Sequence, residues 1–211
     1  MERLSIAKDG LEACVEKAAE VLRRGGVIVY PTDTLYGLGA DAFSDAGFAA
    51  VCAIKERDER RPIHAIFADM HMIEAYAEMT PAAKKLADRF LPGALTLVLA
   101  KKPHVEGGIA RDLPTIGVRI PKHDFCLQLA AAFGKPFTTT SANKSGEPAA
   151  AALQGVLRDL GKDATKIDLA IDGGTLSSDL RSTVVDVRSE EPYILREGVI
   201  SSEAIEEALL A

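Results

Sequence analysis

Residues 27–39 read VIVYPTDTLYGLG, an apolar run followed by a loop of hydroxyls, a carboxylate and glycines. Residues 27–30 predict a short buried strand, and Pro31 ends it because proline cannot donate a hydrogen bond to a strand ladder. The loop offers hydroxyls and backbone amides beyond the strand end, which is where ligands bind in α/β sheets. The stretch therefore predicts an α/β protein with a binding loop here, although a plain strand-to-helix turn fits the same residues.

Apolar runs and helical stripes alternate irregularly along the rest of the chain. A capping box at Asp9-Gly10-Leu11-Glu12 predicts the start of the first helix, which Gly25-Gly26 ends. Several strands follow one another near the middle and the end, which favours a mixed sheet flanked by helices over a repeating βαβ pattern. The predicted strands are 27–30, 63–67, 95–100, 116–120, 137–140, 169–171, 183–187 and 193–196, and the later helices are 45–55, 80–91, 124–133, 149–160 and one that starts after 201–202.

No internal repeat or linker-like stretch divides the 211 residues, so we expect a single domain over 1–211 with a core of about 6–200. No apolar stretch approaches the ~20 residues that cross a bilayer, and the N-terminus lacks a secretory core. We therefore expect a cytoplasmic protein with no membrane partner. The four histidines lack metal-ligand spacing and the three cysteines lie among apolar residues, so we expect buried thiols and no metal site.

Charge is distributed unevenly in this acidic chain. The net charge of −6 argues against bulk nucleic acid as the partner of the whole surface. Cations nevertheless gather at Lys55, Arg57, Arg60 and Arg61, and Arg119 stands alone in an apolar segment. A locally basic cleft in an acidic protein suits a small anionic ligand.

Three segments each admit two interpretations. Lys55 and Arg57 can converge on phosphate oxygens, or they belong to a solvated charge run. Arg119 either faces outward from its strand or presents its guanidinium fork to a carboxylate. Residues 138–146, TTTSANKSG, either hold the phosphate or sugar of a nucleotide or cap the helix near Ala149. The sequence contains no Walker loop, so an ATP site here would need another scheme.

Seven short motifs occur in order, and together they resemble the YrdC/TsaC family of L-threonylcarbamoyladenylate synthases. The resemblance runs from about Ile6 to the end of the chain, and it fits the short form of the family, which lacks an extra C-terminal domain. The motifs are Pro31–Gly39, Lys55-x-Arg57, Pro92-Gly93-x-Leu95-Thr96, Val118–Pro121, Ser141-Ala142-Asn143-x-Ser145-Gly146, Ser182–Asp186 and Arg196-Glu197-Gly198.

The resemblance implies a twisted mixed sheet surrounded by helices, with a large basic cavity on one face. It implies a reaction in which L-threonine, bicarbonate and ATP, with Mg²⁺, give threonylcarbamoyl-AMP and pyrophosphate. The product would pass to separate tRNA threonylcarbamoyl transferase proteins, which modify adenosine 37 of tRNAs that read codons beginning with A. Two alternatives remain: a protein of this fold that binds tRNA or double-stranded RNA, and a carbamoyl-adenylating relative, usually a longer protein with zinc-finger cysteines.

The resemblance also assigns site residues by position. Lys55 and Arg57 would be the catalytic pair that acts on the ATP phosphates, and no residue is assigned to a metal. Two positions depart from the family pattern. Arg61 stands where relatives often have a smaller or less charged residue, and Ile66 stands where some relatives have a histidine near the threonine site. The ATP site would comprise Lys55, Arg57, Arg61, Ser141, Asn143 and Arg196, and the threonine site would comprise Thr34, Arg119, Thr139 and Ser182.

Overall fold

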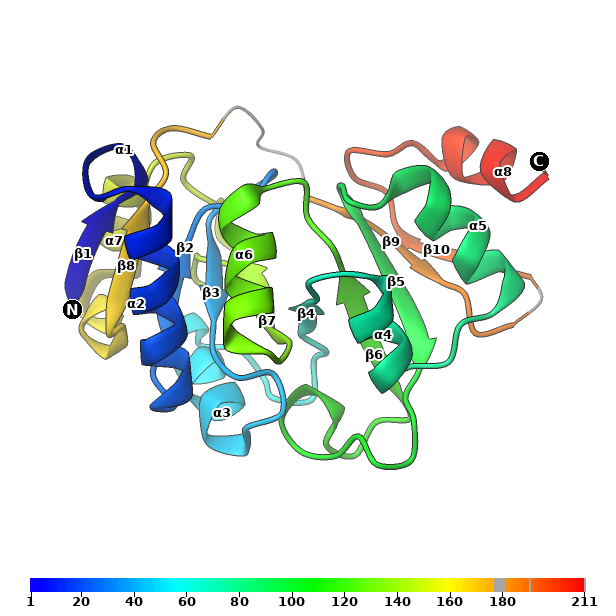
Figure 1. Ribbon diagram of the computed structural model, residues 1–211, viewed down its shortest axis with the longest axis horizontal. Helices are drawn as coiled ribbons and strands as arrows, with labels where there is room; N and C mark the ends of the chain where they lie inside the picture. Colours follow the sequence, from blue (N-terminus) through cyan, green and yellow to red (C-terminus); the bar gives the residue numbers. More distant parts are fainter. Residues whose placement is uncertain (177–180, 190, 211) are drawn as a thin grey trace.

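A ten-stranded mixed sheet organises the residues that the computed structural model describes, which are 1–176, 181–189 and 191–210 (Figure 1). The strand order is β1-β8-β2-β3-β7-β4-β6-β5-β9-β10. The β1/β8, β8/β2, β4/β6 and β5/β9 pairs are parallel, and the other pairs are antiparallel. The strands are β1 Glu2–Ser5, β2 Ile28–Tyr30, β3 Gly37–Gly39, β4 His64–Ile66, β5 Leu95–Ala100, β6 Thr115–Arg119, β7 Phe137–Ser141, β8 Leu169–Asp172, β9 Thr183–Asp186 and β10 Tyr193–Arg196.

Helices cover the sheet, and within the described ranges none is long and apolar enough to span a membrane. Figure 1 shows α2 and α6 side by side over β2, β3 and β7, while α5 and α8 lie together near β9 and β10. The helices are α1 Ile6–Asp9, α2 Leu11–Arg23, α3 Asp45–Lys55, α4 Met70–Tyr76, α5 Pro81–Phe90, α6 Asp124–Phe133, α7 Leu153–Leu160 and α8 Ser202–Leu210, with short 3-10 turns at Gly108–Ala110 and Gly161–Lys166.

Strand β2 explains why residues 27–30 are apolar without alternation. Successive side chains of a strand point to opposite faces of the sheet. Ile28 and Tyr30 pack in the cluster formed with α2 and α6, whereas Val29 packs in the cluster on the other face. Both faces of the central sheet are therefore buried, which requires apolar residues at every position.

The predicted fold class, a mixed α/β sheet flanked by helices, is confirmed. Every predicted strand is found to within one residue at each end, and 95–100, 124–133 and 193–196 match their elements at both ends. The predicted single-domain boundaries, 1–211 with a core of about 6–200, stay a prediction. Strands β1 and β3 and helix α4 were not predicted from the sequence. Strand β3 is only three residues long and holds two glycines, so its pairing with β2 and β7 rather than its propensity defines it.

Two helix starts were predicted wrongly. Asp9 does not cap α2, because its carboxylate accepts a hydrogen bond from the Ser5 amide at 2.7 Å and the N-cap of α2 is Gly10. Asp9 therefore ends the preceding turn instead of opening the helix. The helix predicted from Ala149 begins at Leu153, with Ala152 at its N-cap and no side-chain cap.

Strand β7 joins the two halves of the sheet, and the Thr138 hydroxyl completes its ladder with the end of β3. The Thr138 carbonyl accepts from the Tyr30 hydroxyl at 3.0 Å, and the Ala40 amide is bonded to the Thr138 side chain instead. That amide donates to Thr138 Oγ1 at 3.0 Å, and the same hydroxyl donates to the Leu38 carbonyl at 3.2 Å. A buried side chain thus replaces a backbone acceptor at the centre of the sheet.

We expect Thr138→Val to lower the free energy of unfolding by about 1–3 kcal/mol, the cost of leaving a buried amide without its acceptor. Urea denaturation followed by circular dichroism measures this. Thr165→Val is the matched control, because the Thr165 hydroxyl bonds the Lys162 carbonyl on the exposed surface and its loss should change stability by less than about 0.5 kcal/mol. Equal effects of the two substitutions would contradict the bridging role of Thr138.

Candidate functional site

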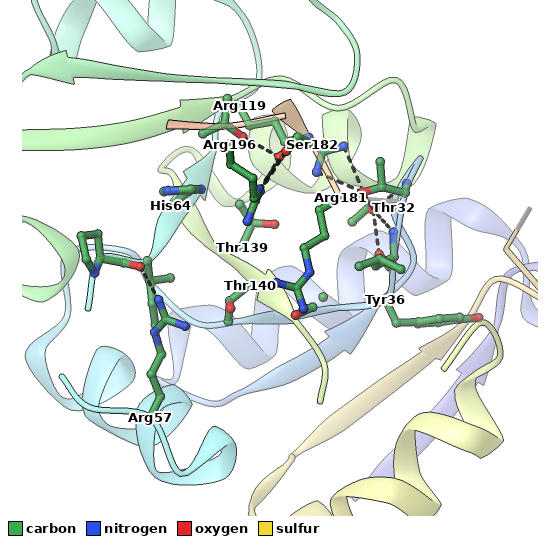
Figure 2. A pocket seen from close by; sticks show the side chains of 17 residues that line it. Thr32, Tyr36, Arg57, His64, Arg119, Thr139, Thr140, Arg181, Ser182 and Arg196 are labelled. Carbon is green, nitrogen blue, oxygen red and sulfur yellow. Dashed lines mark hydrogen bonds between the residues drawn. The ribbon is translucent and has the colours of Figure 1, made fainter. Parts of the chain in front are cut away.

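A cavity of about 120 Å³, open to solvent, lies where the loops of the central strands meet (Figure 2). Four arginines line it, Arg57, Arg119, Arg181 and Arg196, and no aspartate or glutamate does so among the described residues. The basic cavity that the sequence implied is therefore present in a chain of net charge −6.

Strand pleating selects which side chains reach the cavity. His64 of β4 pairs with Thr139 of β7, and Arg119 of β6 pairs with Ile66 two residues further along β4. Paired residues, and residues two apart on one strand, share a face of the sheet. His64, Thr139, Ser141 and Arg119 therefore lie on the same face as Ile66. Ile66 is fully buried there, among the apolar residues beneath α2 and α6.

Arg119 is 5% exposed and meets the loop that follows β2. Its Nη2 forms an ion pair with Asp33 Oδ1 at 2.6 Å, and Nη1 and Nη2 both donate to Thr34 Oγ1 at 3.1 Å. Its Nε donates to the Gly93 carbonyl at 3.4 Å. The outward-facing interpretation of Arg119 is therefore wrong. The structure brings Thr34 and Arg119 together as predicted, and it adds the carboxylate of Asp33, which the sequence argument missed.

Lys55 is 2% exposed and does not line the cavity. Its Nζ donates to the Ser141 carbonyl, to the Asn143 carbonyl at 2.8 Å and to Asn143 Oδ1 at 3.1 Å, while its own carbonyl accepts from the Ser145 amide at 2.9 Å. Burial, with help from Arg57 and Arg181, lowers the pKa of Lys55 to about 7. Lys55 thus belongs neither to a solvated charge run nor to the cavity wall, and it fastens the end of α3 to the loop after β7.

Asn143 completes this clamp from the other side. It is 2% exposed, its Oδ1 accepts from Ser141 Oγ at 2.6 Å, and its Nδ2 donates to the Glu147 carbonyl. Lys144 adds ion pairs to Asp163 and, at 2.8 Å, to Glu56. The loop does not cap α7, so that alternative is wrong. Of the Ser-x-Asn pair, only Ser141 lines the cavity.

Arg57 and Arg61 both follow α3, but only Arg57 lines the cavity. Glu56 caps the helix in the left-handed region, at φ 50°, and turns the chain so that Arg57 faces the cavity. Arg57 Nη2 donates to the Pro62 carbonyl at 2.8 Å, and Nε donates to the Arg61 carbonyl at 3.4 Å. Arg61 is exposed and does not line the cavity, so the structure does not bring this predicted ATP contact to the site.

Ser182 and Arg196 line another part of the cavity wall. Arg196 Nη2 donates to the Ser182 carbonyl at 2.9 Å and to its hydroxyl at 3.3 Å, and the Ser182 hydroxyl lies 2.9 Å from Thr96 Oγ1. Burial and then Arg181, Arg119 and Arg57 lower the pKa of Arg196. The guanidinium groups therefore repel one another across the cavity, a field that favours anions.

The site assignment from the sequence omitted six polar residues that line the cavity, Thr32, Tyr36, His64, Thr96, Thr140 and Arg181. Thr32 lies two residues before the assigned Thr34 in the same loop, and its hydroxyl accepts from the Thr34 and Leu35 amides at 3.1 and 3.2 Å. Arg181 directly precedes Ser182, so its position beside a matched motif was a usable signal. His64 follows Pro62-Ile63 at the start of a strand, and no local pattern marked it.

Comparisons with known proteins identify related sequences and structures. Residues 20–198 match the Sua5_yciO_yrdC family, described as "Telomere recombination". The chain is 36% identical to a Pyrococcus abyssi threonylcarbamoyl-AMP synthase over 91% of this chain and 56% of that protein. It is 32% identical to a rat threonylcarbamoyl-AMP synthase over 94% of this chain and 71% of that protein. The crystal structure of P. abyssi Sua5 complexed with L-threonine superposes with a TM-score of 0.88 at 33% identity, covering 98% of this chain and 60% of that one.

Lys55 predicts a pH dependence of stability. Its pKa is about 7 when folded against 10.5 as the ordinary value, so the unfolded chain binds more protons between these values. The free energy of unfolding should therefore rise with pH from about 7 towards 10, by at most about 1.4 kcal/mol per pH unit, relative to Lys55→Met. Urea titrations between these pH values measure the difference. The exposed control Lys162→Met should run parallel to the wild type, and a parallel Lys55→Met curve would contradict the lowered pKa of Lys55.

Proposed function

The chain belongs to the Sua5/YciO/YrdC family, and from this premise we propose that it is an enzyme that makes threonylcarbamoyl-AMP and pyrophosphate from L-threonine, bicarbonate and ATP. This is the first step in forming threonylcarbamoyl-adenosine in tRNA, and it makes the protein a nucleotidyltransferase. The observation that carries the proposal is the cavity in which four arginines and several hydroxyls converge, with no carboxylate among the described residues of its wall. Such a site holds a polyanion and a small zwitterion side by side.

The chemistry asks the protein mainly for positioning and charge. The amine of threonine takes up bicarbonate to give a carbamate, and a carbamate oxygen then attacks the α-phosphorus in line while pyrophosphate leaves. Negative charge grows on phosphate oxygens in this step, and fixed cations that need no reorganisation stabilise it. Holding both anions in one cavity also replaces an encounter in solution by a contact already made.

We assign the arginines to two ends of the cavity. Arg57 and Arg196 would serve the phosphates, whereas Arg119, which donates to the Thr34 hydroxyl, would face the threonine end. Asp33 forms an ion pair with Arg119, so it neutralises part of the arginine charge and orients the guanidinium group. The threonine carboxylate would meet Arg119, with Thr34, Thr139 and Ser182 around the rest of the amino acid.

Lys55 and Asn143 take a different role from the one first assigned to them. Both are buried behind Ser141, and their hydrogen bonds end on the loop that carries it. We therefore propose that they are positioning residues for Ser141. Arg57 remains the member of the Lys-x-Arg pair that touches substrate.

The cavity does not fit a magnesium ion held by protein carboxylates. No group of three or more metal-ligating side chains occurs in the part of the chain that the structure describes. Mg²⁺ usually keeps several waters and binds substrate phosphates. We propose that Mg²⁺ enters as part of the ATP complex.

The later steps stay within the proposal. Threonylcarbamoyl-AMP would pass to tRNA threonylcarbamoyl transferase proteins, which points to the cytoplasm, where ATP and tRNA meet. Direct binding of tRNA or double-stranded RNA has less support, because the arginines converge inside a hollow and the exposed Arg60 is paired with Asp58. RNA binding through phosphates would weaken steeply with salt, and binding that persists only below about 50 mM salt would leave the enzyme as the main role.

The reaction is tested directly with ¹⁴C-bicarbonate, L-threonine and Mg-ATP. We expect a labelled adenylate and one pyrophosphate for each, with no product when threonine is omitted. Carbamoyl phosphate in place of threonine and bicarbonate should give no adenylate. Adenylate made from carbamoyl phosphate alone would favour the carbamoyl-adenylating alternative, and no adenylate under any condition would overturn the proposal.

Arg57→Ala should lower turnover by about 10²–10³-fold, the typical loss when one preorganised donor to transition-state charge is removed. Steady-state pyrophosphate release measures it. Arg60→Ala is the matched control, because Arg60 lies three residues away, exposed and paired with Asp58, and should stay within about two-fold of wild type. Similar turnover for both variants and the wild type would contradict the role of Arg57.

A further inference from the structure

The imidazole of His64 lines the cavity, and the role of this residue is still open. The neighbouring polar side chains are held by protein atoms: Arg57 by a carbonyl, Arg119 by Asp33 and Thr34, and Arg196 by Ser182. No hydrogen bond drawn among the lining residues engages the His64 ring (Figure 2). The His64 ring therefore forms part of the cavity wall, where it can meet a ligand.

The shape of the sheet seats this ring. His64 begins β4 between β6 and β7 and pairs with Thr139. A Cβ at Gly117 on β6 would lie closer to the His64 ring than van der Waals contact permits, so the ring occupies the space that glycine leaves. This glycine holds the imidazole against the sheet, beside Thr139 and on the same face as Arg119.

Burial and the surrounding positive charges favour the neutral form of His64. Burial and then Arg196, Arg57 and Arg119 lower the pKa of His64 to about 4. These arginines come from β10, from the segment after α3 and from β6, and no carboxylate lines the cavity among the described residues. At pH 7 the empty cavity therefore holds a neutral imidazole among cations. Anionic substrates offset the arginine charges, so their arrival raises the pKa of the ring.

The proposed reaction releases a proton at this place. Threonine enters with an ammonium group, which must become the nitrogen of a carbamate. The nitrogen forms a bond to the bicarbonate carbon, and one carbon–oxygen bond breaks. The nitrogen gives up two protons: one leaves with the departing oxygen as water, and the other needs an acceptor.

Few other groups on the cavity wall can accept that proton. Arginines stay protonated at all relevant pH values, and serine and threonine hydroxyls are far weaker bases than imidazole. The Tyr36 hydroxyl has its pKa raised to about 12 by burial, and it already donates to the Gly174 carbonyl at 2.7 Å. Among the described lining residues, His64 is the neutral base.

We propose that His64 contacts the amino group of threonine and accepts the proton released when the carbamate forms. The proposal rests on the proposed function, because it supplies that reaction with its base. His64 is then a catalytic residue of the first chemical step and takes no part in the attack on phosphorus. When anions offset the charges of the arginines, the pKa of His64 rises and the imidazole becomes a stronger base.

His64→Gln tests the assignment, because glutamine keeps a polar side chain that cannot take up the proton. At pH 7 and limiting bicarbonate, we expect adenylate formation to fall by about 10²-fold, the lower end of the contribution of a general base. The defect should shrink towards pH 9, where bulk water deprotonates the amine. The exposed control His71→Gln on α4 should match the wild type.

The reverse half-reaction separates this role from a structural one. Threonylcarbamoyl-AMP and pyrophosphate give ATP and the carbamate without deprotonation of an amine, so His64→Gln should stay within a few-fold of wild type. Equal losses in both directions, or no loss in either, would overturn the proposal. If the wild type itself made no adenylate, the proposed function would be refuted. The wild-type reaction therefore distinguishes that failure from failure of the His64 proposal.

Histidine-selective NMR gives a readout independent of turnover. The His64 signal, assigned by its loss in His64→Gln, should titrate near pH 4 in the free protein and move up by at least about one pH unit with a non-hydrolysable ATP analogue and bicarbonate. An unchanged midpoint at saturating ligand would overturn the anion-dependent uptake of the proton.

Discussion

Mutual repulsion of four guanidinium groups around one cavity is the constraint on which the rest of the site depends. Each of three is held by protein oxygens: Arg57 by the Pro62 carbonyl, Arg119 by Asp33, and Arg196 by Ser182. These oxygens offset the desolvation and repulsion only in part, since burial and neighbouring arginines still lower the pKa of Arg57 and Arg196. The remaining positive potential in the cavity favours the binding of anionic groups such as phosphate and carboxylate.

The same constraint explains the position of Lys55. A fifth cation on the cavity wall would add repulsion, and Lys55 is instead buried behind it, with carbonyl oxygens of Ser141 and Asn143 as its partners. Those bonds join α3 to the loop after β7, and the ion pairs of Lys144 strengthen the junction. In the Lys-x-Arg motif, Lys55 is therefore bonded to the loop after β7, whereas Arg57 lines the cavity. Histidine fits the crowded wall for a related reason, because it can stay uncharged among the arginines until anions arrive.

The sequence predicted much of the fold because its signals are local. Buried strands such as 95–100 are dense runs of strand-forming residues, and the helix at 124–133 carries an apolar stripe ended by Gly134. The errors occurred where a tertiary contact overrode the local pattern. Asp9 has the chemistry of a cap for α2 but bonds the Ser5 amide, and β3 is a strand only because β2 and β7 supply its hydrogen-bond partners.

The sequence by itself determined the fold class, the family and the segments that form the site, since apolar periodicity and ordered motifs are properties of the linear chain. Tertiary structure alone decided which atoms meet. Thr34 and Asp33, which Arg119 contacts, lie 85 and 86 residues away from it, and the acceptors of Lys55 Nζ lie 86 and 88 residues away. No pattern along the chain reveals that Asp33 shares the arginine, that Lys55 turns inward, or that Gly117 makes room for His64. These facts follow from strand pairing and from the face to which each side chain points, because hydrogen bonds and burial depend on distances in space.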